Sequence, residues 1–117
     1  MDGARLLVVE DEAMIAMLLE DMLADLGCGS VIVAGSLEDA LREAGKAEID
    51  LAIVDLNLGG RDALPVAAVL RDRGVPFVFS TGYGSGGLPA EYRDRLVLQK
   101  PFQEDDLKRC LAAARGG

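Results

Sequence analysis

The sequence predicts an α/β protein in which helices cover both faces of a parallel sheet. Five short apolar runs alternate along the 117 residues with segments whose apolar side chains recur at helical spacing. Residues 49–55 are almost continuously apolar, which suits a strand buried on both faces. Strands that alternate with helices favour right-handed crossovers, and these place helices on both sides of the sheet.

The first half of the chain supplies three strands and two helices. Residues 4–9 are rich in leucine and valine and predict the first strand. Residues 12–26 predict a helix that stops at a glycine, and residues 30–34 predict the second strand. Ser36 is expected to cap the second helix. Residues 49–55 then form the central strand, which ends in the carboxylate of Asp55.

The second half is interrupted by glycines. A glycine loop follows Asp55, and residues 61–73 predict a third helix with Pro65 in its first turn. Residues 77–81 predict the fourth strand, which ends in two hydroxyl side chains. Residues 82–89 hold too many glycines for a regular helix. We therefore expect a mobile loop there, with a fourth helix that is disordered or limited to residues 90–95.

The chain ends with a fifth strand and a last helix. Residues 96–99 predict the strand, and Leu107, Cys110, Leu111 and Ala114 recur at helical spacing after it. A flavodoxin-like, doubly wound (βα)5 sheet with strand order 2-1-3-4-5 is a common solution at this size. We expect residues 1–117 to form a single domain of this kind.

Composition excludes several classes of function. A net charge of −8 argues against binding nucleic acid through its phosphates. No apolar run approaches a membrane span and no signal peptide is evident, so we expect a cytoplasmic protein. The chain has no histidine, which excludes a Ser-His-Asp triad and a His-ligated zinc site. Cys28 and Cys110 lack metal-site spacing and suggest small buried apolar side chains or inert thiols.

Charged and hydroxyl side chains fall at the carboxyl ends of four predicted strands. These are Glu10 and Asp11, Asp55, Ser80 or Thr81, and Lys100. Parallel strands bring these ends to one edge, where ligands bind in open α/β sheets. Three carboxylates in one site repel one another unless a cation lies among them. Mg²⁺ takes one or two carboxylates plus phosphate oxygens, so the pattern predicts Mg²⁺ at Asp11 and Asp55 with one loop carbonyl.

A magnesium site of this kind points to phosphate chemistry. A carboxylate can act as a nucleophile and form an acyl phosphate. Asp55 would attack, Lys100 and the metal would neutralise charge, and Thr81 would hydrogen-bond a phosphoryl oxygen. Each residue type at the edge then has a role.

These motifs resemble the receiver domain of bacterial two-component response regulators over essentially the whole chain. The matching pieces are residues 8–12, the strand ending in Asp55, Thr81 followed by glycine, and residues 100–102. The resemblance implies that Asp55 accepts a phosphoryl group from a histidine kinase or a histidine phosphotransfer protein. It implies signalling by contact with a downstream protein, and at most self-phosphorylation and slow autodephosphorylation rather than an enzyme's turnover.

The resemblance also implies roles for individual residues. Glu10 and Asp11 would bind Mg²⁺ directly or through water, and the backbone carbonyl of Asn57 would complete the protein ligands. Lys100 and Thr81 would sense the phosphoryl group. The Lys100–Pro101 bond resembles a position where receivers carry a cis peptide.

Two features depart from the usual receiver pattern. Receivers place Tyr or Phe where this chain has Val97, so switching with an aromatic partner is not expected in the usual form. Residues 79–84 resemble the receiver subclass named for a Phe-Ala-Thr-Gly signature, with Ser80 replacing Ala. We expect the conformational response in the loop at residues 82–87, where Tyr83 either closes over the site or packs on the surface.

Met14 and Met17 are expected off the main apolar face of the first helix, near the site. They either complete the rim of the core or form a surface that could dock a kinase or phosphotransfer helix.

Three other functions fit this sequence less well. A haloacid-dehalogenase-like phosphatase needs a second Asp where this chain has Asn57. A flavodoxin-like FMN carrier needs phosphate-binding turns where residues 10–12 are acidic. A receiver-like module that binds partners without phosphorylation stays open.

Overall fold

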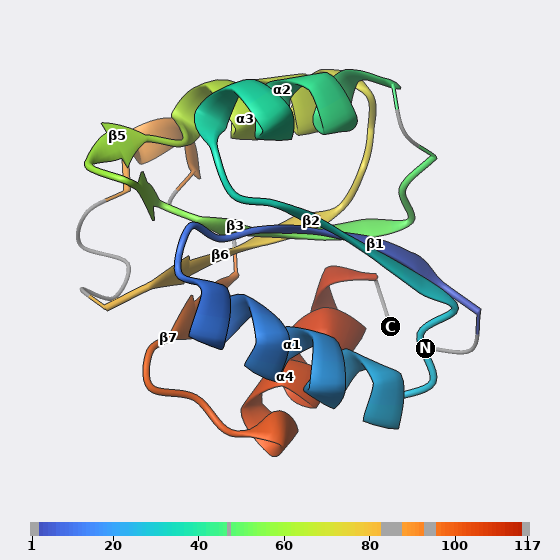
Figure 1. Cartoon of the computed structure of the whole chain (residues 1–117). Coiled ribbons are helices and arrows are strands. Elements are labelled where there is room, and N and C mark those ends of the chain that lie inside the picture. Colours follow the sequence, from blue (N-terminus) through green and yellow to red (C-terminus); the bar gives the residue numbers. More distant parts are fainter. Residues whose placement is uncertain (1–2, 47, 83–87, 93–95, 116–117) are drawn as a thin grey trace.

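A computed structural model describes residues 3–46, 48–82, 88–92 and 96–115 (Figure 1). Its elements, in chain order, are β1 (Arg5–Val9), α1 (Ala13–Asp25), β2 (Ser30–Ala34), α2 (Leu37–Lys46), β3 (Leu51–Asp55), β4 (Asn57–Leu58), β5 (Arg61–Asp62), α3 (Leu64–Asp72), β6 (Phe77–Thr81), the 3₁₀ helix η2 (Ala90–Tyr92), β7 (Val97–Gln99) and α4 (Glu104–Ala114). Among these described helices, none has the length and apolar character needed to span a membrane.

The main sheet has five parallel strands in the order β2-β1-β3-β6-β7. The predicted strands one to five correspond to β1, β2, β3, β6 and β7, so the predicted order 2-1-3-4-5 is confirmed. The register pairs Val8 with Ile53 across β1 and β3, and Asp55 with Ser80 across β3 and β6. The strand that ends in Asp55 therefore lies at the centre of the sheet.

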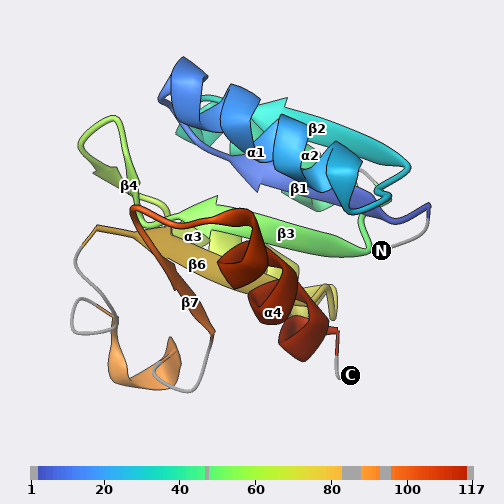
Figure 2. The same cartoon turned by 90° about the horizontal axis from the view of Figure 1, so that it is seen from below.

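Helices cover both faces of the sheet. Figure 1 shows α2 and α3 above it and α1 and α4 below it, and Figure 2 shows the second pair from below. Because successive side chains of a strand point to opposite faces, each strand contributes to both cores. Val54 and Phe79 pack in the core between the sheet and the helices α2 and α3. Ile53 and Val78 pack in the core between the sheet and the helices α1 and α4.

Local signals in the sequence account for most element boundaries. The α1 helix lies within one residue of the predicted limits at each end. The Ser36 Oγ accepts a hydrogen bond from the Asp39 N–H at 3.1 Å, so its predicted capping role is confirmed. The Lys100–Pro101 peptide is cis, as the family resemblance implied.

The segment after Asp55 differs from the prediction of a glycine loop followed by a helix from residue 61. Its residues form a small antiparallel hairpin of β4 and β5, joined by Gly59 and Gly60. Both glycines have positive φ, at 62° and 83°, as a tight two-residue hairpin turn requires. The third helix consequently begins at Leu64, three residues later than predicted, with Pro65 in its first turn as expected.

An aromatic cluster fixes the short 3₁₀ helix η2 to the sheet. The centroid of the Tyr92 ring lies 5.6 Å from the centroid of the Phe79 ring and 6.3 Å from that of the Phe77 ring, and both pairs are edge-on. The Arg71 guanidinium lies over the same ring at 5.4 Å. A short helix is what the sequence predicted near residue 90. The predictions for the loop at residues 83–87, including closure by Tyr83, lie outside the described residues.

Candidate functional site

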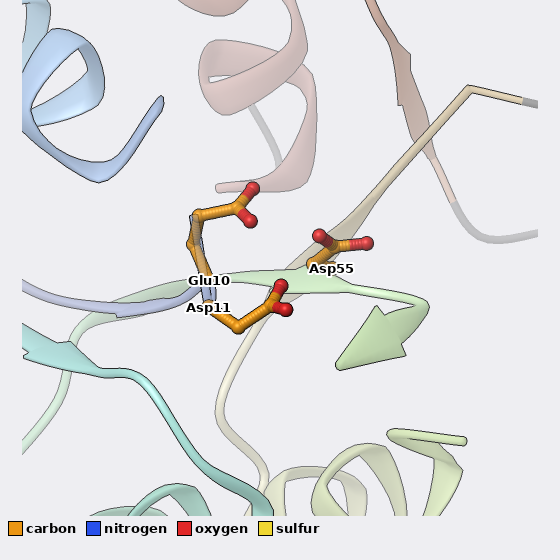
Figure 3. A group of neighbouring side chains, drawn as sticks. All are labelled: Glu10, Asp11 and Asp55. Carbon is orange, nitrogen blue, oxygen red and sulfur yellow. The ribbon is translucent and has the colours of Figure 1, made fainter. Parts of the chain in front are cut away.

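The carboxyl ends of the strands bring three acidic side chains together. Glu10 and Asp11 directly follow β1, and Asp55 is the last residue of β3. One ligand oxygen from each carboxylate lies within 4.8 Å of the other two. Figure 3 shows the three side chains gathered beside the end of β3. The sequence prediction that these residues share one edge of the sheet agrees with this geometry.

Lys100 joins two of these carboxylates. Its Nζ lies 2.9 Å from Glu10 Oε1 and 3.0 Å from Asp55 Oδ2. Glu10 and Asp55 are 2% and 5% exposed, so both charges are held away from solvent. The three carboxylates carry a charge of −3 against +1 on the lysine, which leaves about −2 at the site. That balance suits a divalent cation with oxygen ligands such as Mg²⁺.

Burial and pairing shift the pKa values of the partners. Burial raises the pKa of Glu10 above its ordinary value of 4.5, and the hydrogen bond from Lys100 opposes that rise only in part. Burial also acts to lower the pKa of Lys100, but its hydrogen bonds to Glu10 and Asp55 raise it above 10.5 overall. Lys100 therefore stays charged at neutral pH.

Backbone donors hold the carboxylates in place. The Glu12 N–H donates to Glu10 Oε2 at 3.1 Å, and the Asn57 N–H donates to Asp55 Oδ1 at 3.0 Å. The Asn57 side chain accepts a bond from the Gly60 N–H at 2.9 Å, which fixes the hairpin turn. These two hydrogen bonds hold Asn57, in the first strand of the hairpin, next to the Asp55 carboxylate. Asn57 lies beside the acidic group, where its carbonyl was expected to contribute.

A cavity of about 570 Å³ opens beside Asp55, and Thr81, Lys100 and Asn57 line it with Asp55. Thr81 is the last residue of β6 and is 4% exposed. Asp62 also lines this cavity and was not singled out from the sequence. The two-residue strand that carries Asp62 is too short to leave a periodic signal.

A second cavity lies next to the first and is almost wholly apolar. It measures about 280 Å³, and its lining residues are Ile15, Leu18, Lys100, Pro101 and Phe102. Lys100 lines both cavities, so the acidic group adjoins an apolar surface on α1. On that helix Met14 is 84% exposed and Met17 is 63% exposed, in agreement with their predicted place off the main apolar face.

Comparison with known proteins assigns the family. The family model described as the response regulator receiver domain matches residues 6–112 of this chain. This chain belongs to the response regulator receiver family. Receiver domains are signalling domains that work with histidine kinases or phosphotransfer proteins, and the family binds Mg²⁺ at an acidic cluster like the one described above.

Two of the curated relatives that match are about twice as long as this chain. The transcriptional regulatory protein PdtaR of Mycobacterium tuberculosis is 34% identical over 107 residues, which cover 88% of this chain and 52% of that protein. The two-component response regulator PhoP of Pseudomonas aeruginosa is 35% identical over 116 residues, covering 93% of this chain and 50% of PhoP. The chain spans about half the length of these relatives.

Two of the solved structures that match do so over nearly their whole length. SdrG from Sphingomonas melonis Fr1 is 42% identical with a TM-score of 0.82, covering 97% of this chain and 98% of SdrG. The receiver domain of the sensor histidine kinase PA1611 from Pseudomonas aeruginosa is 26% identical with a TM-score of 0.80, covering 98% and 99%. That structure holds a magnesium ion coordinated in its active-site cleft.

Proposed function

We propose that this chain is a single phosphoacceptor receiver domain, in which Asp55 takes a phosphoryl group from a histidine kinase or a histidine phosphotransfer protein. One Asp55 oxygen would form the new bond to phosphorus as the bond between phosphorus and the donor's histidine nitrogen breaks. The observation that carries the proposal is the contact between Lys100 Nζ and Asp55 Oδ2 at the wall of the 570 Å³ cavity. That contact supports the proposal because the Lys100 ammonium lies within reach of the oxygens of a phosphoryl group bound to Asp55.

The chain's own residues would divide the work around Asp55. Glu10, Asp11, Asp55 and the Asn57 carbonyl would hold Mg²⁺, which supplies charge neutralisation for the phosphoryl oxygens when it is bound. Lys100 would transfer its hydrogen bond from Asp55 to a phosphoryl oxygen. Thr81, on the cavity wall, would donate its hydroxyl to another. The backbone bond from the Asn57 N–H would keep Asp55 oriented.

The exposed methionines on α1 would serve the phosphoryl donor. Met14, Met17 and Leu18 are exposed on α1, and Leu18 lines the apolar cavity that adjoins Lys100. Flexible, polarizable Met side chains suit the apolar face of a partner helix. A kinase or phosphotransfer helix seated there would lie next to the acidic group. The phosphorylated domain would then signal by contact with a downstream protein.

The first experiment is intact-mass spectrometry after incubation with Mg²⁺ and a small acyl phosphate. We expect the mass of one phosphoryl group on the wild-type protein, and none on Asp55→Ala or in the presence of EDTA. Asp72→Ala is the matched control, because its carboxylate is exposed at the end of α3 and pairs only at the surface. A phosphoryl group that survives in Asp55→Ala would show that another residue is the acceptor.

Two further assays separate the alternatives. Failure of the wild-type protein to gain a phosphoryl group or to bind Mg²⁺ would favour a receiver-like module that binds partners without phosphorylation. Steady hydrolysis of a small phosphoester would instead favour a phosphatase, although Asn57 stands where that class needs a second Asp.

A further inference from the structure

Ser80 belongs to the polar group at the strand ends, yet its hydroxyl has no hydrogen-bond partner. Its Oγ is buried and unpaired among the described residues, and the residue as a whole is 1% exposed. A buried hydroxyl that lacks a partner is unfavourable, so such a group in a structure calls for an explanation. By contrast, three of the charged side chains at this edge, Glu10, Asp55 and Lys100, have partners.

The strand register places Ser80 on the same face of the sheet as these neighbours. Val78, two residues before Ser80, packs in the core under α1 and α4, and side chains alternate along a strand. Ile53 packs in that same core two residues before Asp55. Ser80 and Asp55 are direct register partners on β6 and β3. Both side chains therefore stand on the α1 and α4 face, one strand apart.

Lys100 must cross the end of β6 to reach its partners. It follows β7, and the sheet order places β6 between β7 and β3. Its Nζ nonetheless bonds Asp55 at the end of β3 and Glu10 after β1, which lies one strand further away. The methylene stem of Lys100 thus spans the strand that carries Ser80. A methylene stem has no donor or acceptor, so a stem that crosses β6 offers a hydroxyl on that strand no partner.

We propose that Ser80 is a positioning residue for Lys100. When Glu10 and Asp55 bind a divalent cation, the Ser80 hydroxyl accepts a hydrogen bond from the Lys100 ammonium. This rests on the proposed function, because it requires Mg²⁺ to bind at the acidic group. When the carboxylates become metal ligands, Lys100 gives up a bond that it makes in the cation-free protein. An ammonium that is only partly exposed is stabilised by another acceptor inside the protein, and the Ser80 Oγ is an unpaired acceptor on the strand that the lysine stem crosses.

The test compares Mg²⁺ binding and thermal stability in four proteins. Isothermal titration calorimetry gives the Kd for Mg²⁺ in wild type, Ser80→Ala, Ser80→Cys and Lys100→Met. We expect Ser80→Ala to weaken Mg²⁺ binding roughly three- to tenfold, which is the range of one hydrogen bond. We expect Ser80→Cys to weaken it similarly, because the thiol keeps the size but is a weak acceptor. Without cation, the melting temperature of Ser80→Ala should equal or exceed that of wild type.

A double variant shows whether Ser80 acts through the lysine. In the Lys100→Met background the stem remains but the ammonium is gone, so adding Ser80→Ala should leave the Kd for Mg²⁺ unchanged. An undiminished effect of Ser80→Ala in that background would overturn the proposal. Wild-type affinity in Ser80→Ala or Ser80→Cys would also overturn it, as would a cation-free melting temperature of Ser80→Ala below that of wild type. If the wild-type protein itself fails to bind Mg²⁺, it is the proposed function that fails.

Discussion

Lys100 Nζ lies 3.0 Å from Asp55 Oδ2, and this contact joins the end of β7 to the last residue of β3 across the intervening strand. The same ammonium reaches Glu10, so one cation compensates two buried carboxylates. A divalent metal at this site must therefore compete with a positive charge that belongs to the chain. Removing the lysine charge should therefore lower the stability of the cation-free protein and raise its affinity for the metal.

Replacing Lys100 with methionine should destabilise the cation-free protein and strengthen its binding of Mg²⁺. The change leaves two buried carboxylates without their cation, which should lower the free energy of unfolding by roughly 2–3 kcal/mol, given that Lys100 is partly exposed. It also removes the competing charge, so the Kd for Mg²⁺ should fall. Urea unfolding and calorimetry measure the two effects. Unchanged stability without Mg²⁺ would contradict the bridging role of Lys100.

The raised pKa of Glu10 predicts a pH-dependent difference between the wild-type protein and Glu10→Gln. A carboxyl group whose pKa is higher in the folded state binds its proton more tightly there than in the unfolded chain. Its contribution to stability is therefore largest below about pH 4.5 and is lost as the pH rises through the raised value. Wild type should gain stability relative to Glu10→Gln as the pH falls from 7 towards 4.5.

Urea unfolding of both proteins across this pH range, without divalent cations, measures that difference. The glutamine variant keeps the size of the side chain and removes its titration. A difference in the free energy of unfolding that stays constant with pH would show that the pKa of Glu10 is not shifted by folding.

Two glycine-to-alanine changes should have opposite effects on stability. A Cβ added at Gly29 would lie 2.7 Å from the backbone oxygen of Gly3, so Gly29→Ala should cost about 1–3 kcal/mol. Gly45 lies inside α2 with open space around its Cα, so Gly45→Ala should stabilise by about 0.5–1 kcal/mol. Thermal unfolding of the two variants beside wild type measures both effects. Changes in stability of the same sign in both variants would contradict the packing described.

Removing the ring of Tyr92 should destabilise the domain through the aromatic cluster. Tyr92→Ala loses the edge-on contacts with Phe77 and Phe79 and leaves a cavity, at a cost of about 3–5 kcal/mol. Tyr92→Phe keeps the ring and should stay within about 1 kcal/mol of wild type. Denaturant unfolding tests the pair. A small effect of Tyr92→Ala would indicate that η2 is held by other contacts.

The sequence predicted most of the fold because its strands are short apolar runs with sharp polar ends. Residues 49–55 illustrate this, since burial on both faces demands an uninterrupted apolar run and Asp55 marks the edge. The hairpin of β4 and β5 was not predicted, because strands of two residues carry no periodicity. Its turn chemistry was visible only as the pair Gly59 and Gly60, which suits a loop equally well.

The members of the candidate site were predictable, but their pairing was not. Strand ends placed Glu10, Asp55 and Lys100 at one edge, yet nothing in the spacing shows that the lysine bonds both acids. Glu10 and Lys100 are 90 residues apart, and the bond between them depends on the strand order and on the reach of the lysine stem. The unpaired hydroxyl of Ser80 is likewise a property of packing, which no motif records.

Because Lys100 supplies a counter-ion from within the chain, this domain can fold before it meets a metal. Proteins that depend on a metal for their structure couple the two events, and they unfold when the ion is removed. Here the Lys100 ammonium pairs with Glu10 and Asp55 when no cation is bound. If the domain binds Mg²⁺ as proposed, the chain would fold first and bind the cation second, so the cellular supply of Mg²⁺ would set how much of the protein is competent to signal and not how much of it is folded.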